Sequence, residues 1–213
     1  MKRKIINNSL MILSLILLVI VLQSNNYMSL FQVKNEIKNS FKISADSAII
    51  WQKNFPLKWE DYRMKPPKSP HFDALTTSGV LFKIDSQTKD FVVVSTYNYF
   101  YKYQSWTTKN SPELLQHEQL HFDITEVQAR KLRKVLENYS IHNFQAAQKF
   151  LNDSYSRLIQ EGVAMQNRYD METQHGRNLV EQAKWEKKIH ADLETYKAFS
   201  NPILKIKKGT IRP

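Results

Sequence analysis

The chain has 213 residues and a formal net charge of +11, and 42% of its residues are hydrophobic, which is enough for one domain with a core. It has no cysteine, which excludes disulfides, thiolate catalysis, cysteine-ligated metals and a lipoprotein anchor. Its four glycines form neither of the phosphate-binding patterns GxGxxG and GxxxxGK[ST]. The positive charge is concentrated at the ends, since residues 2–4 carry +3, residues 201–213 carry +4 and the rest only +4, so we expect no nucleic-acid partner.

The first 26 residues are typical of an export signal. Three basic residues precede an apolar run from Leu10 to Leu22, which is long enough for a signal-peptide core and shorter than the roughly 20 residues of a spanning helix. Ile5 and Ile6 extend the run, and no cleavage site of small residues follows it. A cleaved signal peptide and an uncleaved membrane anchor through residues 5–22 are both consistent with this pattern. In either case we expect the rest of the chain to be exported, to the periplasm, the extracellular space or the outer face of a membrane.

Strand-like sequence is followed by helical sequence in the exported part. Residues 27–48 have the composition of a spacer, and a domain is expected over residues 49–200. Within it, residues 76–87 and 89–103 are rich in β-branched and aromatic residues around the turn DSQTKD, which predicts a β-hairpin. Helices are expected over residues 112–138, 143–168 and 178–199, the first with Ser111 as N-cap and Pro112 at the first helical position. This order predicts an α+β fold, followed by a basic tail over residues 201–213.

The sequence HEQLH, residues 117–121, lies near the start of the first expected helix. Residues four apart share a helix face, so His117 and His121 can both reach one metal ion. Glu118 lies about 100° around the helix, an offset suited to a carboxylate that contacts water at the metal rather than the metal itself. This geometry is the reason that HExxH is a motif of zinc hydrolases. Without a metal, two inward-facing histidines would carry a desolvation cost.

A catalytic zinc ion usually has three protein ligands, so a third must come from another part of the chain. The expected break between the second and third helices, YDMETQHG at residues 169–176, concentrates polar groups and contains Gly176. Helix capping alone also explains part of this composition. If the break belongs to the site, His175 is the first choice for the third ligand, with Glu172 and Asp170 as alternatives. Tyr169, or His175 if it is not a ligand, would then stabilise an oxyanion.

Three separate motifs resemble one bacterial family. They are LKWEDYRMKPP followed by ALTTSG, then LLQHEQLHFDITEVQARKL, then YDMETQHGRNLVEQAKWE. Together these motifs resemble the DUF922 family, described as predicted secreted zinc-dependent proteases, over roughly residues 49–190. The resemblance implies a zincin-like fold with zinc on His117 and His121, and with Glu118 as the catalytic acid and base. It also implies that the segment 169–176 belongs to the site.

These observations predict a zinc peptidase that acts on a protein or peptide substrate, with Zn²⁺ held by His117, His121 and His175, and with Glu118 and Tyr169 as catalytic groups. One alternative is an exported zinc-containing binding or scaffold module without catalytic activity, in which a fourth protein ligand closes the metal site. Another is an envelope scaffold protein without a metal. The oligomeric state is left open by the sequence.

Overall fold

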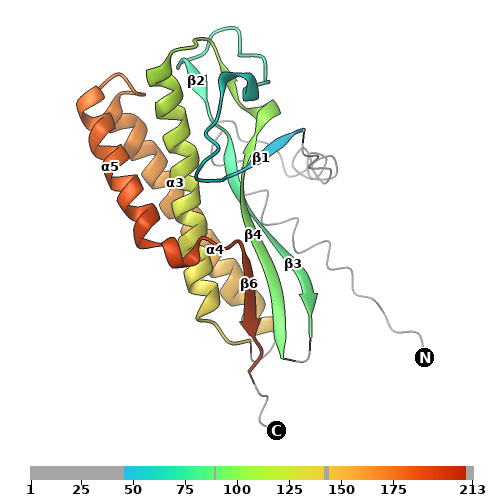
Figure 1. Cartoon of the computed structure of the whole chain (residues 1–213). Helices are drawn as coiled ribbons and strands as arrows, with labels where there is room; N and C mark the ends of the chain where they lie inside the picture. The colour runs from blue at the N-terminus through green and yellow to red at the C-terminus, as the bar shows by residue number, and fades with distance from the viewer. Residues whose placement is uncertain (1–45, 89, 142–143, 210–213) are drawn as a thin grey trace.

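The computed structural model of the chain describes residues 46–88, 90–141 and 144–209 (Figure 1). The expected spacer over residues 27–48 falls mostly outside this part, as does the whole export segment. Within the described residues, no helix combines the length and apolarity needed to cross a membrane. The expected signal peptide or anchor therefore stays a prediction.

The described fold combines short strands with three long helices, as the α+β prediction requires. The strands are β1 (Ala48–Ile50), β2 (Ala74–Leu75), β3 (Ser78–Gln87), β4 (Phe91–Tyr101), β5 (Trp106–Thr107) and β6 (Ile203–Lys207). The helices are α3 (Pro112–Glu137), α4 (Phe144–Thr173) and α5 (Leu179–Thr195), with single 3₁₀ turns η1 (Trp59–Asp61), η2 (Lys102–Gln104) and η3 (Lys197–Phe199).

The main sheet is built on the expected hairpin. Strands β3 and β4 pair antiparallel, and one irregularity in their register lies between Ile84 and Ser86. On the other edge of β4, strand β1 pairs with one end and β6 with the other, both antiparallel. Strands β2 and β5 form a separate antiparallel pair. The structure thus confirms the hairpin and adds four short strands, β1 and β6 in the same sheet and β2 and β5 in the separate pair.

Helix α3 is the central element, because it contacts the sheet on one side and both other helices on the other (Figure 1). The Ser111 hydroxyl accepts a hydrogen bond from the backbone nitrogen of Leu114, which confirms Ser111 as the N-cap, and Pro112 is the first helical residue. One apolar cluster lies between α3, α4 and the sheet, and a second surrounds Tyr169 between α3 and α5. Both faces of α3 are therefore buried, which fixes the direction of its side chains.

Two expected boundaries were wrong. Residues 201–213 were expected to be a basic tail, whereas Ile203–Lys207 pairs with β4 as β6 and buries Leu204 and Ile206. The second helix was expected to end at residue 168, whereas α4 continues to Thr173. The break between α4 and α5 is accordingly shorter than the segment 169–176, and Tyr169 and Asp170 are helical residues. This extension fixes both side chains on the face of α4 that meets α3.

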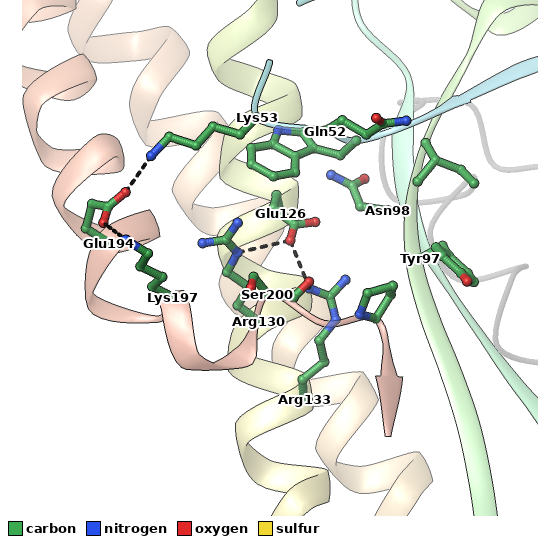
Figure 2. Close-up of a pocket in the computed structure, with 13 residues that line it drawn as sticks. Gln52, Lys53, Tyr97, Asn98, Glu126, Arg130, Arg133, Glu194, Lys197 and Ser200 are labelled. Atoms are coloured by element: carbon green, nitrogen blue, oxygen red, sulfur yellow. Dashed lines mark hydrogen bonds and ion pairs between the residues drawn. The ribbon is translucent and has the colours of Figure 1, made fainter. Parts of the chain in front are cut away.

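A buried ionic network anchors the second half of α3 (Figure 2). Glu126 Oε1 accepts hydrogen bonds from Arg130 Nε at 3.0 Å and Arg133 Nη1 at 2.8 Å. Arg130 also donates to the Leu193 carbonyl, and Arg133 donates to the carbonyls of Thr96 and Phe199. These contacts tie α3 to β4, to the end of α5 and to η3. Glu126, Arg130 and Arg133 also line a cleft of about 330 Å³. Both guanidinium groups already donate hydrogen bonds to oxygen atoms of the protein.

Replacing Glu126 by leucine tests this network. The variant leaves Arg130 and Arg133 buried without their acid, so we expect a loss of about 3–5 kcal/mol in the free energy of unfolding. The matched control is Asp153→Leu, which removes the exposed ion pair with Lys149 on α4 and should change stability little. Urea unfolding of both variants measures the difference. Equal losses in the two variants would show that the buried network does not anchor the fold.

Candidate metal centre

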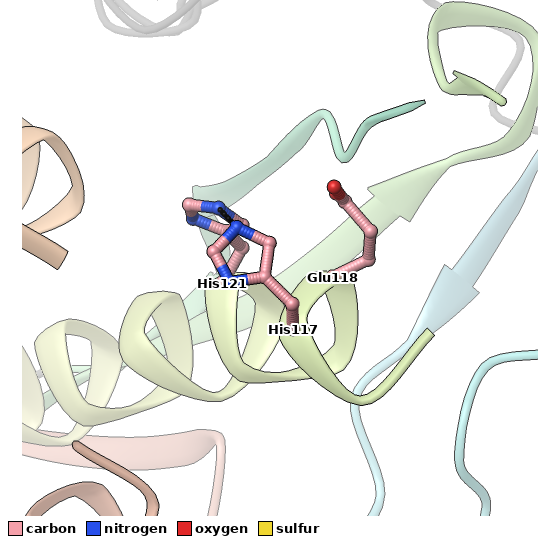
Figure 3. Close-up of side chains that lie close together, drawn as sticks. All are labelled: His117, Glu118 and His121. Carbon is pink, nitrogen blue, oxygen red and sulfur yellow. Dashed lines mark hydrogen bonds between the residues drawn. The ribbon is translucent and has the colours of Figure 1, made fainter. Parts of the chain in front are cut away.

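Two histidines of α3 point into the junction with α4. The rings of His117 and His121 lie with their centroids 4.8 Å apart and their Nε2 atoms 3.2 Å apart. Figure 3 shows both rings, with Glu118 beside them, projecting from the same side of the helix. His117 is almost completely buried and His121 is partly buried. The i, i+4 spacing has therefore brought the two imidazoles together as the sequence predicted.

Asp170 of α4 supplies a third converging atom. Its Oδ1 lies 3.1 Å from His117 Nε2 and 3.0 Å from His121 Nε2. The three atoms thus form a nearly equilateral triangle, with all sides between 3.0 and 3.2 Å. The Asp170 side chain is 30% exposed, so this triangle is reachable from solvent. Of the three alternatives from the break segment, the geometry favours Asp170 as the partner of the histidine pair.

The other ring nitrogen of each histidine faces a glutamine. His117 Nδ1 lies 3.2 Å from Gln182 Oε1, and His121 Nδ1 contacts Gln166 Oε1. A side-chain amide oxygen only accepts hydrogen bonds, so each Nδ1 carries a proton. When the imidazoles are neutral, two Nε2 lone pairs and a carboxylate oxygen point at one another. Such a set of donor atoms fits a metal ion.

The pKa shifts of His121 and Asp170 indicate that a positive charge is favourable between the two histidines and Asp170. Burial acts to lower the pKa of His121, but the charge of Asp170 and its hydrogen bond raise this pKa to about 9. Burial acts to raise the pKa of Asp170, yet the charge of His121 and hydrogen bonds from both imidazoles hold it well below its usual range. The junction thus stabilises a cation, whether a proton or a metal ion.

Glu118 lies beside this triangle with a carboxylate oxygen that has no partner. The residue is 3% exposed, and its buried Oε2 has no hydrogen-bond partner among the described residues. Glu118, His117 and His121 each place one ligand-type atom within 4.8 Å of the others. The negative charge of Glu118 also contributes to raising the pKa of Tyr62, after the larger effect of burial. A buried carboxylate without a partner is costly, so its position here indicates a functional role.

Tyr169 lies behind the histidines. Its ring stacks on that of His117 with centroids 4.6 Å apart, and it meets the ring of His121 edge to face. Its hydroxyl lies 2.8 Å from Gln182 Oε1 and 3.1 Å from the carbonyl oxygen of His117. Tyr169 was predicted to stabilise an oxyanion, but a fully buried hydroxyl committed to two protein acceptors favours a role in supporting the histidine rings.

His175 and Glu172 lie farther from the triangle. His175 Nδ1 is 3.4 Å from Asp170 Oδ1, its side chain is 47% exposed, and its ring stacks on Phe72. The prediction that His175 is a ligand stays a prediction, because the residue places a ring nitrogen close enough to join His117 and Asp170 around an ion. Glu172 accepts hydrogen bonds from Arg168 and from the indole of Trp185, so its carboxylate is occupied elsewhere.

Gln166 and Gln182 were missed by the sequence analysis. Gln166 lies four residues before Asp170, so the two share a face of α4 once the helix is known to continue to Thr173. That spacing was a readable signal, hidden by the expected helix end at residue 168. Gln182 had no comparable signal, because it reaches His117 only through the packing of α5 against α3.

Gly176 allows the α4–α5 turn to lie against His117. Its φ is +79°, and a Cβ at this position would come within 3.0 Å of His117 Cβ and Cγ. We expect Gly176→Ala to lower the free energy of unfolding by at least about 1 kcal/mol and to weaken metal binding, because the left-handed conformation is costly and the ring must move. Thermal unfolding and metal titration measure both effects.

The control for this substitution is Gly162→Ala within α4. Its added Cβ would meet only the flexible Gln128 side chain, at 3.3 Å, so metal affinity should not change. A Gly176→Ala variant with unchanged affinity would contradict the close contact between the turn and His117.

Comparison with known proteins finds similarity to a family model. The model of the DUF922 family, described as bacterial proteins of unknown function, matches residues 102–176. The matched segment contains α3 and α4 and ends at Gly176, so it includes the histidine pair, Glu118, Asp170 and His175. No curated protein and no solved structure matches the chain. Over residues 102–176, the segment that carries its candidate metal centre, the chain is similar to the DUF922 family.

Proposed function

We propose that the protein is a zinc-dependent peptidase whose metal is held by His117, His121 and Asp170 and whose general base is Glu118. The observation that carries this proposal is the combination of three converging donor atoms with a buried, unpartnered carboxylate oxygen beside them. The residues 1–26 are typical of an export signal, so the protein is proposed to act outside the cytoplasm on protein or peptide substrates.

Zinc suits this set of ligands. It binds imidazole nitrogen and carboxylate oxygen at about 2.0–2.2 Å in tetrahedral geometry, which places neighbouring ligand atoms roughly 3.3 Å apart. The observed separations of 3.0–3.2 Å are close to that value. The chain has no cysteine, so histidine and carboxylate are the expected donors. Two neutral imidazoles and one carboxylate would leave the ion with a net positive charge, which favours chemistry over a purely structural role.

Glu118 is the group that moves the proton. When bound, a zinc ion supplies a Lewis acid that polarises a carbonyl group and lowers the pKa of water toward about 7. Glu118 takes a proton from the attacking water at its carboxylate as the new C–O bond forms. It then gives that proton to the leaving amine as the C–N bond breaks, so the proton balance closes within one turnover. The unpartnered Oε2 is the atom available for this transfer.

His175 is the remaining candidate for a donor to the substrate carbonyl. It is half exposed, it lies next to Asp170, and it is not buried by other side chains as Tyr169 is. Its ring stacks on Phe72, which in turn stacks on Trp106 with centroids 5.7 Å apart. This aromatic column holds the imidazole at the solvent side of the metal centre.

A second candidate function depends on whether His175 binds the ion. If His175 swings toward the ion, four protein ligands would surround it, and a closed tetrahedral site is typical of structural zinc. The 3.4 Å between His175 Nδ1 and Asp170 Oδ1 makes this geometry accessible. The protein would then be an exported binding or scaffold module without catalytic activity.

The variant Glu118→Gln separates the two functions. We expect it to keep zinc, because Glu118 is not a ligand, and to lose hydrolysis by about 10²–10⁴-fold, because the amide cannot accept the proton. Zinc content is measured by elemental analysis of the purified full chain, and hydrolysis with a library of quenched fluorescent peptides. Full activity in Glu118→Gln would overturn the mechanism, and a zinc-loaded wild type that cleaves nothing would favour the structural module.

The pair Asp170→Asn and Glu172→Gln tests the third ligand. Both remove one carboxylate from the last turns of α4, but only Asp170 faces the histidines. We expect Asp170→Asn to weaken zinc binding by more than the roughly 10–100-fold that loss of an outer partner costs. Glu172→Gln should bind zinc as the wild type does. Competition with a chromophoric chelator measures both affinities, and the opposite order of effects would show that Glu172 is the ligand.

A further inference from the structure

We propose that Gln166 and Gln182 are positioning residues that hold His121 and His117 with the proton on Nδ1, in the one tautomer able to bind the metal through Nε2. This inference rests on the metal centre of the proposed function. It does not depend on whether that centre hydrolyses peptides. Gln166 and Gln182 each contact a histidine. They are distinct from Asp170, which supplies the third donor atom, and from Glu118, the proposed base.

The orientation of the Gln182 amide follows from its neighbours. Its Nε2 donates to Glu186 Oε1 at 2.9 Å, and a carboxylate can only accept, so the NH₂ group must face Glu186. The oxygen Oε1 then faces His117 Nδ1 at 3.2 Å and the hydroxyl of Tyr169 at 2.8 Å. Gln182 is 5% exposed, so water cannot easily replace these partners. His117 is thereby held with its proton on Nδ1.

The Gln166 amide is fixed in the same way. Its Nε2 donates to the backbone carbonyl of His121 at 2.9 Å and to Thr125 Oγ1 at 3.3 Å. A carbonyl oxygen only accepts, so Gln166 Oε1 must be the atom that contacts His121 Nδ1. Gln166 therefore binds both the backbone and the ring of one histidine. Rotation of that ring would break its contact with Gln166 Oε1, while the amide stays anchored to the backbone.

Amide partners have a different effect from the carboxylates that often back metal-binding histidines. A carboxylate bonded to Nδ1 raises the basicity of the imidazole and adds negative charge near the metal. An amide oxygen fixes the same tautomer without adding a charge. The nearest carboxylate in the Gln182 network, Glu186, lies one hydrogen bond farther out. The ion would thus keep more of its positive charge for polarising a substrate.

The two glutamines also come from different helices. Gln166 lies on α4 and Gln182 on α5, while both histidines lie on α3. The tautomers are therefore correct only when all three helices are packed together. Tyr169 strengthens this dependence, because its hydroxyl shares Gln182 Oε1 and its ring stacks on His117. Helix packing and ligand geometry are set by the same contacts.

Substitution of each glutamine by methionine, which is of similar size, tests the role. We expect Gln166→Met and Gln182→Met to weaken zinc binding by about 10–100-fold each. The matched control is Gln119→Met on α3. Gln119 accepts a hydrogen bond from Leu57 and donates one to Asp123, and neither bond involves a histidine. The control should lose stability in urea without losing zinc affinity.

A nitrogen-detected NMR spectrum of the zinc-loaded wild type tests the tautomers without any variant. We expect both ring protons on Nδ1 and slow exchange with water, and each methionine variant should accelerate exchange for its own histidine only. Protons on Nε2, or methionine variants that bind zinc as the wild type does, would overturn the inference. A wild type that binds no zinc overturns it together with the proposed function, whereas zinc binding without hydrolysis overturns the peptidase alone.

Discussion

Three electron-rich atoms within 3.0–3.2 Å of one another repel unless a positive charge lies among them, and the junction of α3 with α4 is built around this constraint. Both helices must hold their side chains there in spite of the repulsion. Tyr169 fills the space behind the two rings, and Gly176 lets the following turn approach His117 closely. A cation between the donor atoms would turn this repulsion into attraction, so binding of a cation would be coupled to helix packing.

The rest of α3 is fixed on every side, which keeps the histidines from shifting under this strain. Toward the C-terminus of the helix, Glu126 and its two arginines hold β4, α5 and η3. Near the histidines, Asp123 Oδ1 accepts a hydrogen bond from the indole nitrogen of Trp51 at 2.7 Å. Burial raises the pKa of Asp123. Asp123 is thus a structural anchor of the segment before β2.

Local rules predicted the part of the site that lies within one helix. The spacing of His117 and His121 and the Ser111 cap follow from α-helical geometry alone. Asp170 was only an alternative to His175, and the helix was expected to end at residue 168, although no proline or glycine lies between residue 168 and Gly176. Strand β6 was missed because its lysines suggested a tail. Its buried Leu204 and Ile206 alternate with exposed lysines, which is the period of a strand, but its partner β4 lies about a hundred residues earlier.

The turn after α4 shows where the fold carries its strain. Gln174 and His175 have φ of 52° and 54°, a conformation that side chains other than glycine adopt at a cost of about 1–3 kcal/mol each. Helix termination requires only one such residue, and Gly176 already provides it. The His175–Phe72 stack and the ion pair between Arg177 and Asp73 join this turn to the segment before β2. The result is a half-exposed histidine held next to Asp170 at the edge of the candidate metal centre.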